Sequence, residues 1–305
     1  MKLEHLTGLI AAPPTAMRAD GSVNLETIER QAHALAAGGV RGAFVCGTTG
    51  ESMSLSTAER MRVAERWTQV APTDFAVIVH AGHTSLADSR DLAAHAQRIG
   101  ARAIAAMPPF FFRPDDVEGL VAVGAEVAAA APGLPFYYYH IPAMTGVYLK
   151  MSDYLPAAAA RIPTLTGMKF TCEDLMDYGR CVRLDGGRFN MLFGRDEILL
   201  SALVLGATGA VGTTYNLAAP LYLRVMEAFA RGDLESARAD QHRAAEFVAV
   251  LMRFGVIPAT KAAMKLTGVD CGPVRLPLRP IEGSQLDKLR EALDAVGFSE
   301  FCIRA

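Results

Sequence analysis

Two reactive side chains, Tyr139 and Lys169, end two apolar, strand-like runs in the middle of the sequence. A lysine on the buried face of a strand is costly to keep charged, because loss of water favours the neutral amine and lowers its pKa. A neutral amine can attack a ketone, and a neighbouring phenol can move protons. The pair therefore predicts a Schiff-base site, although a lone lysine that ends a strand usually extends its ammonium group into solvent.

Alternation along the two runs predicts which side chains share a face. In the first run, Tyr137 and Tyr139 face one side of the strand and Tyr138 faces the other. In the second run the odd positions share a face, so we expect Lys169 to point the same way as Leu165 and Gly167.

Both runs belong to a repeating pattern in which a short apolar run precedes a segment of helical periodicity. The pattern occurs eight times between residues 8 and 231. Eight such units can close a barrel or form a doubly wound sheet, but this regular alternation without a nucleotide-binding fingerprint favours the barrel. We predict an α/β fold, a (β/α)8 TIM barrel over residues 1–231, with a C-terminal helical extension over residues 232–305 packed on it.

In such a barrel the catalytic groups gather at the carboxyl ends of the strands. The residues expected at those ends include groups suited to bind or transform a small polar substrate: Thr48, Thr49, His80, Tyr139, Lys169, Thr171, Gly194, Asp196, Glu197, Gly212 and Thr213.

The motif G-T-T-G-E at residues 47–51 follows the second expected strand. Its glycines allow a tight turn that aims backbone N–H groups and the hydroxyls of Thr48 and Thr49 at one point, which is a cradle for a carboxylate. It is not a phosphate-binding P-loop, because no Gly-Lys-Ser/Thr follows. The alternative is an ordinary surface turn.

Asp196 and Glu197 open the helix expected after the seventh strand. They are candidate hydrogen-bond acceptors for substrate hydroxyls. The competing interpretation is purely structural, since Asp is a favoured N-cap and Glu is favoured in the first helical turn.

A zinc-dependent aldolase is the alternative to the lysine chemistry, with His80, His83 and His140 as ligands. These histidines lie in expected loops and lack an evident carboxylate or cysteine partner. The lysine route needs no metal and no cofactor, and we expect neither.

Composition narrows the classes of partner. The chain has 305 residues, is 51% hydrophobic and carries a net charge of −2 with both signs scattered along it, which argues against nucleic acid and against a charged membrane surface. Five cysteines without a C-x-x-C pair indicate a reducing compartment, and residues 1–14 lack a secretory signal pattern, so we expect a cytoplasmic protein.

Four motifs together resemble one enzyme family: G-T-T-G-E at 47–51, Y-Y-Y-H-I-P-A-M-T-G at 137–146, G-M-K-F-T at 167–171 and G-R-D-E at 194–197. They are similar to those of the pyruvate-dependent lysine aldolases, the family of dihydrodipicolinate synthase and N-acetylneuraminate lyase. The likeness covers nearly the whole chain, and within the family it points to the branch that cleaves sialic acid to pyruvate and N-acetylmannosamine.

The resemblance implies roles for individual residues. Lys169 would form the imine, Tyr139 would move protons, and the Thr48 and Thr49 hydroxyls would hold the substrate carboxylate. The other substrate-binding residues implied are Thr171 and Thr213 as positioning groups, Asp196 and Glu197 for the sugar hydroxyls, and Gly194 and Gly212. The family also suggests a homotetramer.

Met144 stands where dihydrodipicolinate synthases carry an arginine for a second substrate carboxylate, which points away from those synthases. Two other features depart from the family pattern. Phe110–Phe112 stands where many members have a tyrosine that they insert into a neighbouring subunit. Arg195 stands where an uncharged residue is usual, so another 2-keto-3-deoxy sugar acid is an alternative substrate, for an aldolase or a dehydratase. A sugar-acid binding protein without activity is the alternative from another class.

Overall fold

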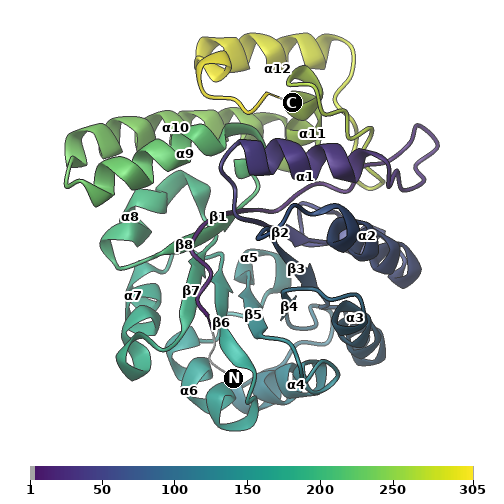
Figure 1. Ribbon diagram of the computed structural model, residues 1–305, viewed down its shortest axis with the longest axis vertical. Helices are drawn as coiled ribbons and strands as arrows, with labels where there is room; N and C mark the ends of the chain where they lie inside the picture. Colours follow the sequence, from purple (N-terminus) through teal and green to yellow (C-terminus); the bar gives the residue numbers. More distant parts are fainter. Residues whose placement is uncertain (1–3, 305) are drawn as a thin grey trace.

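The computed structural model describes residues 4–304, and its centre is a closed barrel of eight parallel strands in chain order (Figure 1). Each strand pairs with the next, and β8 pairs with β1. The predicted TIM barrel is confirmed. The strands are β1 Gly8–Ala11, β2 Gly42–Val45, β3 Ala76–His80, β4 Ala103–Ala106, β5 Phe136–His140, β6 Leu165–Phe170, β7 Asn190–Phe193 and β8 Gly209–Gly212.

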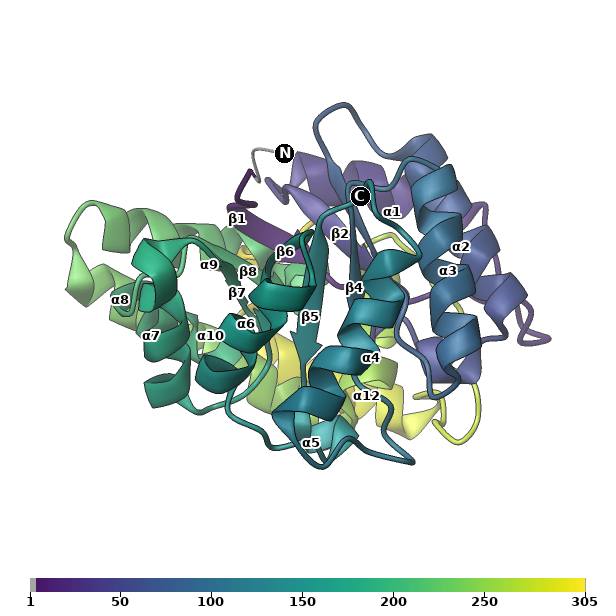
Figure 2. The ribbon, with the colours of Figure 1, turned by 90° about the horizontal axis from the view of Figure 1, so that it is seen from below.

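Helices surround the barrel and return the chain to the start of each next strand (Figures 1 and 2). They are α1 Thr27–Ala37, α2 Thr57–Val70, α3 Leu86–Arg98, α4 Val117–Ala129, α6 Met151–Arg161, α7 Leu175–Arg183, α8 Leu199–Val204 and α9 Tyr215–Ala230, with a single turn α5 Pro142–Thr145 after β5. We did not predict α5, and α9 is broken at Ala218, whose φ of −129° and ψ of 27° are not helical. Pro220 lies two residues after this break, in the first turn of the helical segment that follows it, where the missing N–H would have no helical partner.

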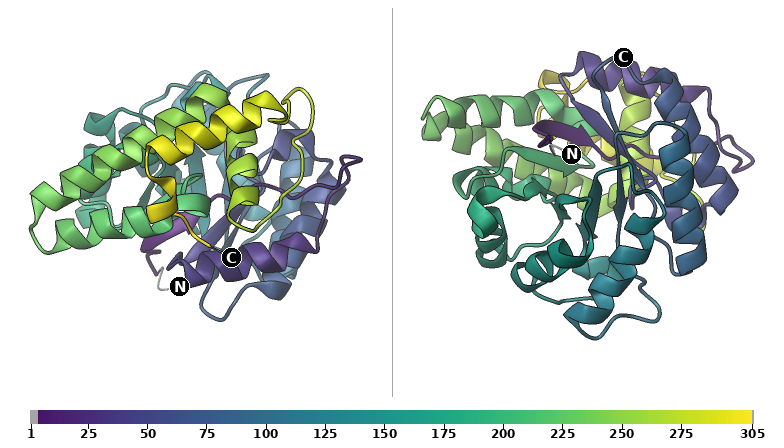
Figure 3. Two further views of the ribbon diagram at one scale, coloured as in Figure 1. Left: turned by 90° about the horizontal axis from the view of Figure 1, so that it is seen from above. Right: turned by 60° about the horizontal axis from the view of Figure 1, so that its bottom comes forward.

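Three further helices follow the barrel: α10 Leu234–Phe254, α11 Val256–Leu266 and α12 Ser284–Ala295. α10 packs along α9, and α11 and α12 pack against α10 (Figure 3). Within residues 4–304, no single helix has the length and apolarity needed to cross a membrane, although α10 and α11, bent by 111° at their junction, pass that test as a pair.

Two separate apolar clusters stabilise the barrel. One fills its interior and contains Phe44, Tyr137 and Tyr139, while the other lies between the strands and the surrounding helices and contains Tyr138. The predicted division of the three tyrosines between two faces is therefore confirmed.

The predicted face of Leu165 is wrong. The register between β5 and β6 shifts by one residue, so that Phe136 pairs with Leu165 but Tyr137 pairs with Gly167. The extra residue is a bulge, and a bulge moves every side chain on one side of it to the opposite face. Leu165 consequently joins the outer cluster, whereas Lys169 points into the barrel toward Phe44 and Tyr139.

Local signals explain where helices begin. Ser56 accepts a hydrogen bond from the Glu59 N–H at 3.2 Å, and Glu59 accepts one from the Ser56 N–H at 2.9 Å, which is a capping box at the start of α2. Glu59 also pairs with Arg275, and this guanidinium holds the pKa of the Glu59 carboxyl at about 2. The segment after α11 is thereby tied to the helix that follows the G-T-T-G-E turn.

Candidate active site

Lys169 and Tyr139 are register partners at the carboxyl ends of β6 and β5, inside the barrel. Lys169 is 4% exposed, and its Nζ lies 4.2 Å from the centre of the Phe44 ring and 4.3 Å from that of Tyr139. Burial lowers the pKa of the Lys169 amine to about 7, and the Asp196 carboxylate opposes this shift. A large fraction of the amine is therefore neutral and nucleophilic near neutral pH.

The Tyr139 phenol is placed to exchange protons at the same point. Its oxygen lies 3.2 Å from the Thr48 Oγ1. Burial raises the pKa of Tyr139 to about 12, and hydrogen bonds with Thr48 and Thr171 oppose this shift. The phenol is therefore protonated near neutral pH and can donate a proton to a developing oxyanion or hydroxide.

The turn at residues 47–51 contacts side chains at the carboxyl ends of β5 and β8. The Thr48 hydroxyl faces Tyr139, and the Thr49 hydroxyl lies 2.6 Å from that of Thr213, which follows β8. In the described part of the chain, neither the Thr48 nor the Thr49 N–H donates to a backbone carbonyl. Two hydroxyls and two amides without a backbone partner have the chemistry that the predicted carboxylate cradle needs.

The predicted reason for the glycines in this turn needs correction. The left-handed backbone angles fall on Cys46 and Glu51, with φ of 55° and 54°, and not on Gly47 or Gly50. The glycines are required by close packing, because a Cβ on Gly47 would lie 2.9 Å from the Phe44 ring. Gly47 thus lets Phe44 reach the Lys169 amine.

Asp196 is a buried carboxylate of the site and does not cap α8. Its side chain reaches across to the end of β8, where Oδ2 accepts hydrogen bonds from the Thr214 N–H at 2.9 Å and the Thr214 hydroxyl at 2.6 Å. Oδ1 is buried without a hydrogen-bond partner among residues 4–304. Burial raises the pKa of Asp196 to about 6, and the nearby Lys169 opposes this. An unsatisfied buried acceptor is suited to receive a substrate hydroxyl.

Two predicted glycines have roles that packing explains. A Cβ on Gly212 would lie 2.1 Å from the Asp196 Oδ1, and one on Gly194 would lie 2.1 Å from the Thr171 Oγ1. Both glycines therefore make room for polar groups of the site, and the structure does not require either to contact the substrate directly.

Glu197 and Arg195 form the outer part of the same loop. The Arg195 Nε lies 3.2 Å from the Glu197 Oε1, and the other end of the guanidinium pairs with Glu173, in the segment between β6 and α7. The Arg195 fork is thus engaged by two carboxylates. Both of its carboxylate partners are residues of this chain, so Arg195 is not an unpaired cation available to a second substrate carboxylate.

The histidines of the zinc hypothesis are not brought together. His80 points into the barrel against Tyr139, whereas His140 packs outside it against Tyr138 and Phe170. In the part of the chain that the structure describes, no three His, Cys, Asp or Glu side chains cluster in a way that would hold a metal ion. Burial lowers the pKa of His80 well below its usual value, so its ring is neutral.

Sequence reasoning missed Phe44 and Thr214. Phe44 follows from alternation along β2, because a side chain two residues after Gly42 shares its face, but only the barrel places its ring on Lys169. Thr214 lies next to the predicted Thr213, but its role is to donate hydrogen bonds to Asp196. Asp196 lies in the loop before α8, so this contact forms only when the barrel folds.

Comparison with known proteins agrees with this geometry. A family model described as the Dihydrodipicolinate synthetase family matches residues 5–296. This chain belongs to that family. The N-acetylneuraminate lyase of Rattus norvegicus is 43% identical to it over 303 residues, which are 98% of this chain and 95% of the relative. The resemblance seen in the four motifs is therefore confirmed.

Solved structures show the same likeness. The N-acetylneuraminate lyase of Proteus mirabilis superposes with a TM-score of 0.94 at 42% identity and covers 97% of this chain and 100% of its own. A DHDPS from Cyanidioschyzon merolae with lysine bound superposes with a TM-score of 0.90 at 29% identity, covering 97% of this chain and 100% of its own. The chain is more similar to the lyases than to this synthase.

Proposed function

We propose that this protein is a lysine-dependent aldolase that cleaves N-acetylneuraminate to pyruvate and N-acetylmannosamine. The observation that carries the proposal is the buried Lys169 amine, held between Phe44 and Tyr139, whose pKa burial lowers and the Asp196 carboxylate raises. The relatives named N-acetylneuraminate lyase, which are 43% identical over nearly the full chain, supply the substrate.

The first half of the reaction forms an imine. The neutral Lys169 amine attacks the C2 ketone of the open-chain substrate, while the Thr48 and Thr49 hydroxyls and amides hold the carboxylate. Tyr139 gives a proton to the C2 oxygen, which leaves as water from the carbinolamine. The resulting iminium is the electron sink for the next step.

The second half breaks the C3–C4 bond. The Tyr139 phenolate takes the proton of the C4 hydroxyl as the electron pair of that bond moves into the iminium, which releases the aldehyde and leaves a pyruvate enamine. Protonation of the enamine at C3 and addition of water to the imine release pyruvate and restore the Lys169 amine. Thr171 and Thr213 border this point and orient the reacting groups.

The contacts of the loop at residues 194–197 favour a sugar substrate over a diacid. Asp196 offers an unused buried acceptor, and Glu197 lies beside it at the edge of the loop. Arg195 is already paired with Glu173 and Glu197, so a second substrate carboxylate would have to displace these partners. Asp196 and Glu197 bind the sugar hydroxyls in this proposal.

We also propose that the chain assembles as a homotetramer. Exposed apolar side chains lie in the segments after β4 and β5, at the barrel end that carries Lys169: Phe111 is 75% exposed, Phe112 85%, Met144 62% and Tyr148 72%. A group of exposed aromatic side chains is typical of a protein interface. Sedimentation analysis of the purified chain tests this assembly.

The test of the proposed function is release of pyruvate from N-acetylneuraminate, measured beside a panel of other 2-keto-3-deoxy sugar acids. Incubation with pyruvate and borohydride should add a pyruvate-sized adduct to the peptide that contains Lys169, and the Lys169→Ala variant should show none. Faster turnover of another acid would change the substrate, whereas an adduct on a different lysine, or none, would refute the mechanism.

A further inference from the structure

Glu51, the last residue of the G-T-T-G-E turn, is held by the C-terminal extension. It has left-handed backbone angles, is 5% exposed, and donates its N–H to the Thr48 carbonyl at 3.0 Å. Its Oε1 lies 2.7 Å from the Nζ of Lys261 on α11, and the two side chains are 1% and 3% exposed. Its Oε2 accepts a hydrogen bond from the Arg275 N–H at 2.8 Å.

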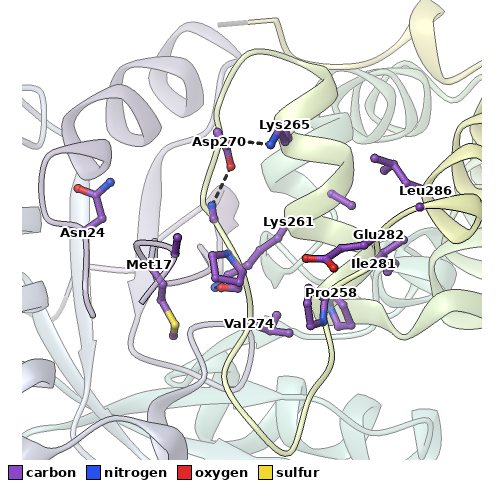
Figure 4. Close-up of a pocket in the computed structure, with 16 residues that line it drawn as sticks. Met17, Asn24, Pro258, Lys261, Lys265, Asp270, Val274, Ile281, Glu282 and Leu286 are labelled. Atoms are coloured by element: carbon purple, nitrogen blue, oxygen red, sulfur yellow. Dashed lines mark hydrogen bonds and ion pairs between the residues drawn. The ribbon is translucent and has the colours of Figure 1, made fainter. Parts of the chain in front are cut away.

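The conformation of Glu51 depends on its contact with Lys261. A residue with a Cβ adopts left-handed angles only where its surroundings enforce them. A buried carboxylate must also be paired, since an isolated buried charge is strongly unfavourable. Lys261 supplies the charge that pairs with this carboxylate, and its ammonium group also donates to the Pro273 carbonyl at 2.6 Å. Figure 4 shows its side chain extending from α11 toward the segment around Val274.

Gln241 of α10 makes a comparable contact with the other substrate-binding turn. It is 9% exposed, its Nε2 donates to the Asp196 carbonyl at 3.3 Å, and its Oε1 accepts the Leu200 N–H at 2.8 Å. One carboxamide thus bridges both ends of the segment that carries Asp196 and Glu197. Neither Gln241 nor Lys261 takes part in the reaction steps described above.

We propose that Lys261 and Gln241 are positioning residues through which the C-terminal helices hold the two ends of the substrate separately. Lys261 orients the turn that binds the 2-keto acid, and Gln241 orients the turn that binds the sugar hydroxyls. The inference rests on the proposed function for this assignment of the two turns.

The Lys261 half is tested with pyruvate alone. Lys261→Met removes the ammonium group paired with the buried Glu51 carboxylate and leaves it only the hydrogen bond from the Arg275 N–H, so it should lower both the melting temperature and the affinity for pyruvate, the latter by about tenfold or more. The double variant Glu51→Gln/Lys261→Met carries no unpaired charge at this position and should regain most of the melting temperature. Lys265→Met is the matched control, because Lys265 lies on the same helix in an exposed ion pair with Asp270.

Pyruvate affinity of the double variant decides the outcome. It is measured by the pyruvate concentration that gives half-maximal borohydride trapping. We expect it to stay several-fold weaker than in the wild type although stability is restored, since the tether to the turn is gone. Wild-type affinity in the double variant, or an equal loss in Lys265→Met, would show that Lys261 only stabilises the fold.

The Gln241 half is tested by comparing two ligands. Gln241→Met keeps the length of the side chain but removes both hydrogen bonds. We expect kcat/KM for N-acetylneuraminate to fall by about tenfold, with pyruvate affinity within twofold of the wild type. His242→Met, at the exposed neighbouring position, is the control and should change neither. Equal losses for both ligands, or no loss in Gln241→Met, would refute a separate role.

The outcomes also separate this inference from the proposed function. If the wild type does not cleave N-acetylneuraminate but traps pyruvate on Lys169, the substrate is wrong, and the pyruvate test of Lys261 still holds. The Gln241 test then uses whichever sugar acid the panel identifies.

Discussion

Replacing Lys169 by methionine should stabilise the protein while abolishing its chemistry. Burial lowers the pKa of this amine from the usual 10.5 to about 7, so the folded state disfavours a proton that the unfolded chain holds readily. The difference of about 3.5 pH units corresponds to about 5 kcal/mol at acid pH, where the amine is charged in both states. Methionine has a similar length and no charge to desolvate.

The gain should depend on pH in a defined direction. Between pH 7 and 10.5 the unfolded state binds more protons at Lys169 than the folded state, so the destabilising contribution of this residue declines as pH rises across this window. The advantage of Lys169→Met should therefore be greatest below pH 7. From the same pKa values it is about 5 kcal/mol at pH 6 and about 2 kcal/mol at pH 9.

The assay is equilibrium urea unfolding of both proteins at pH 6, 7, 8 and 9, at one protein concentration, because assembly also affects stability. Lys265→Met is the control. The same substitution at this exposed site should give a difference in unfolding free energy from the wild type that changes little with pH. The buried-amine argument is refuted if the difference in unfolding free energy between Lys169→Met and the wild type does not shrink as pH rises. It is also refuted if the variant is less stable than the wild type at pH 6.

Further predictions concern catalysis. The rate of imine formation with pyruvate should fall as pH drops through about 7, and Asp196→Asn should move this fall to lower pH, because the Asp196 carboxylate raises the pKa of Lys169; a fall near 10 would contradict it. Tyr139→Phe should keep the fold and lose turnover by about 100-fold or more in a pyruvate-release assay, and near wild-type turnover would place the proton transfers elsewhere. Gly212→Ala should push the Asp196 carboxylate aside, since the new Cβ would meet Oδ1 at 2.1 Å, so kcat/KM for the sugar should fall while pyruvate trapping persists. Arg195→Val should leave diacid turnover no faster than in the wild type and weaken N-acetylneuraminate cleavage only modestly; fast diacid turnover lost in this variant would favour the alternative substrate.

The chemistry of the site was predictable from local sequence. Tyr139 and Lys169 each end an apolar run, and eight recurrences of the same pattern place the ends of those runs at one mouth of a barrel. The side-chain alternation of β5 was also predictable, because a period of two is a property of the strand itself. The face of Leu165 was not, since a bulge depends on the pairing of two strands and leaves no mark on the pattern of either.

The tertiary structure decided which groups surround the lysine and what holds them there. Phe44, Asp196 and Thr214 come from three different parts of the barrel, and their contacts depend on closure of the sheet. Lys261 and Gln241 contact turns far from them in the chain, and as single residues of amphipathic helices they are indistinguishable by sequence from surface or filler positions. Periodicity specifies the face that a helix buries, but the partner of that face is set by packing between elements that are distant in the sequence.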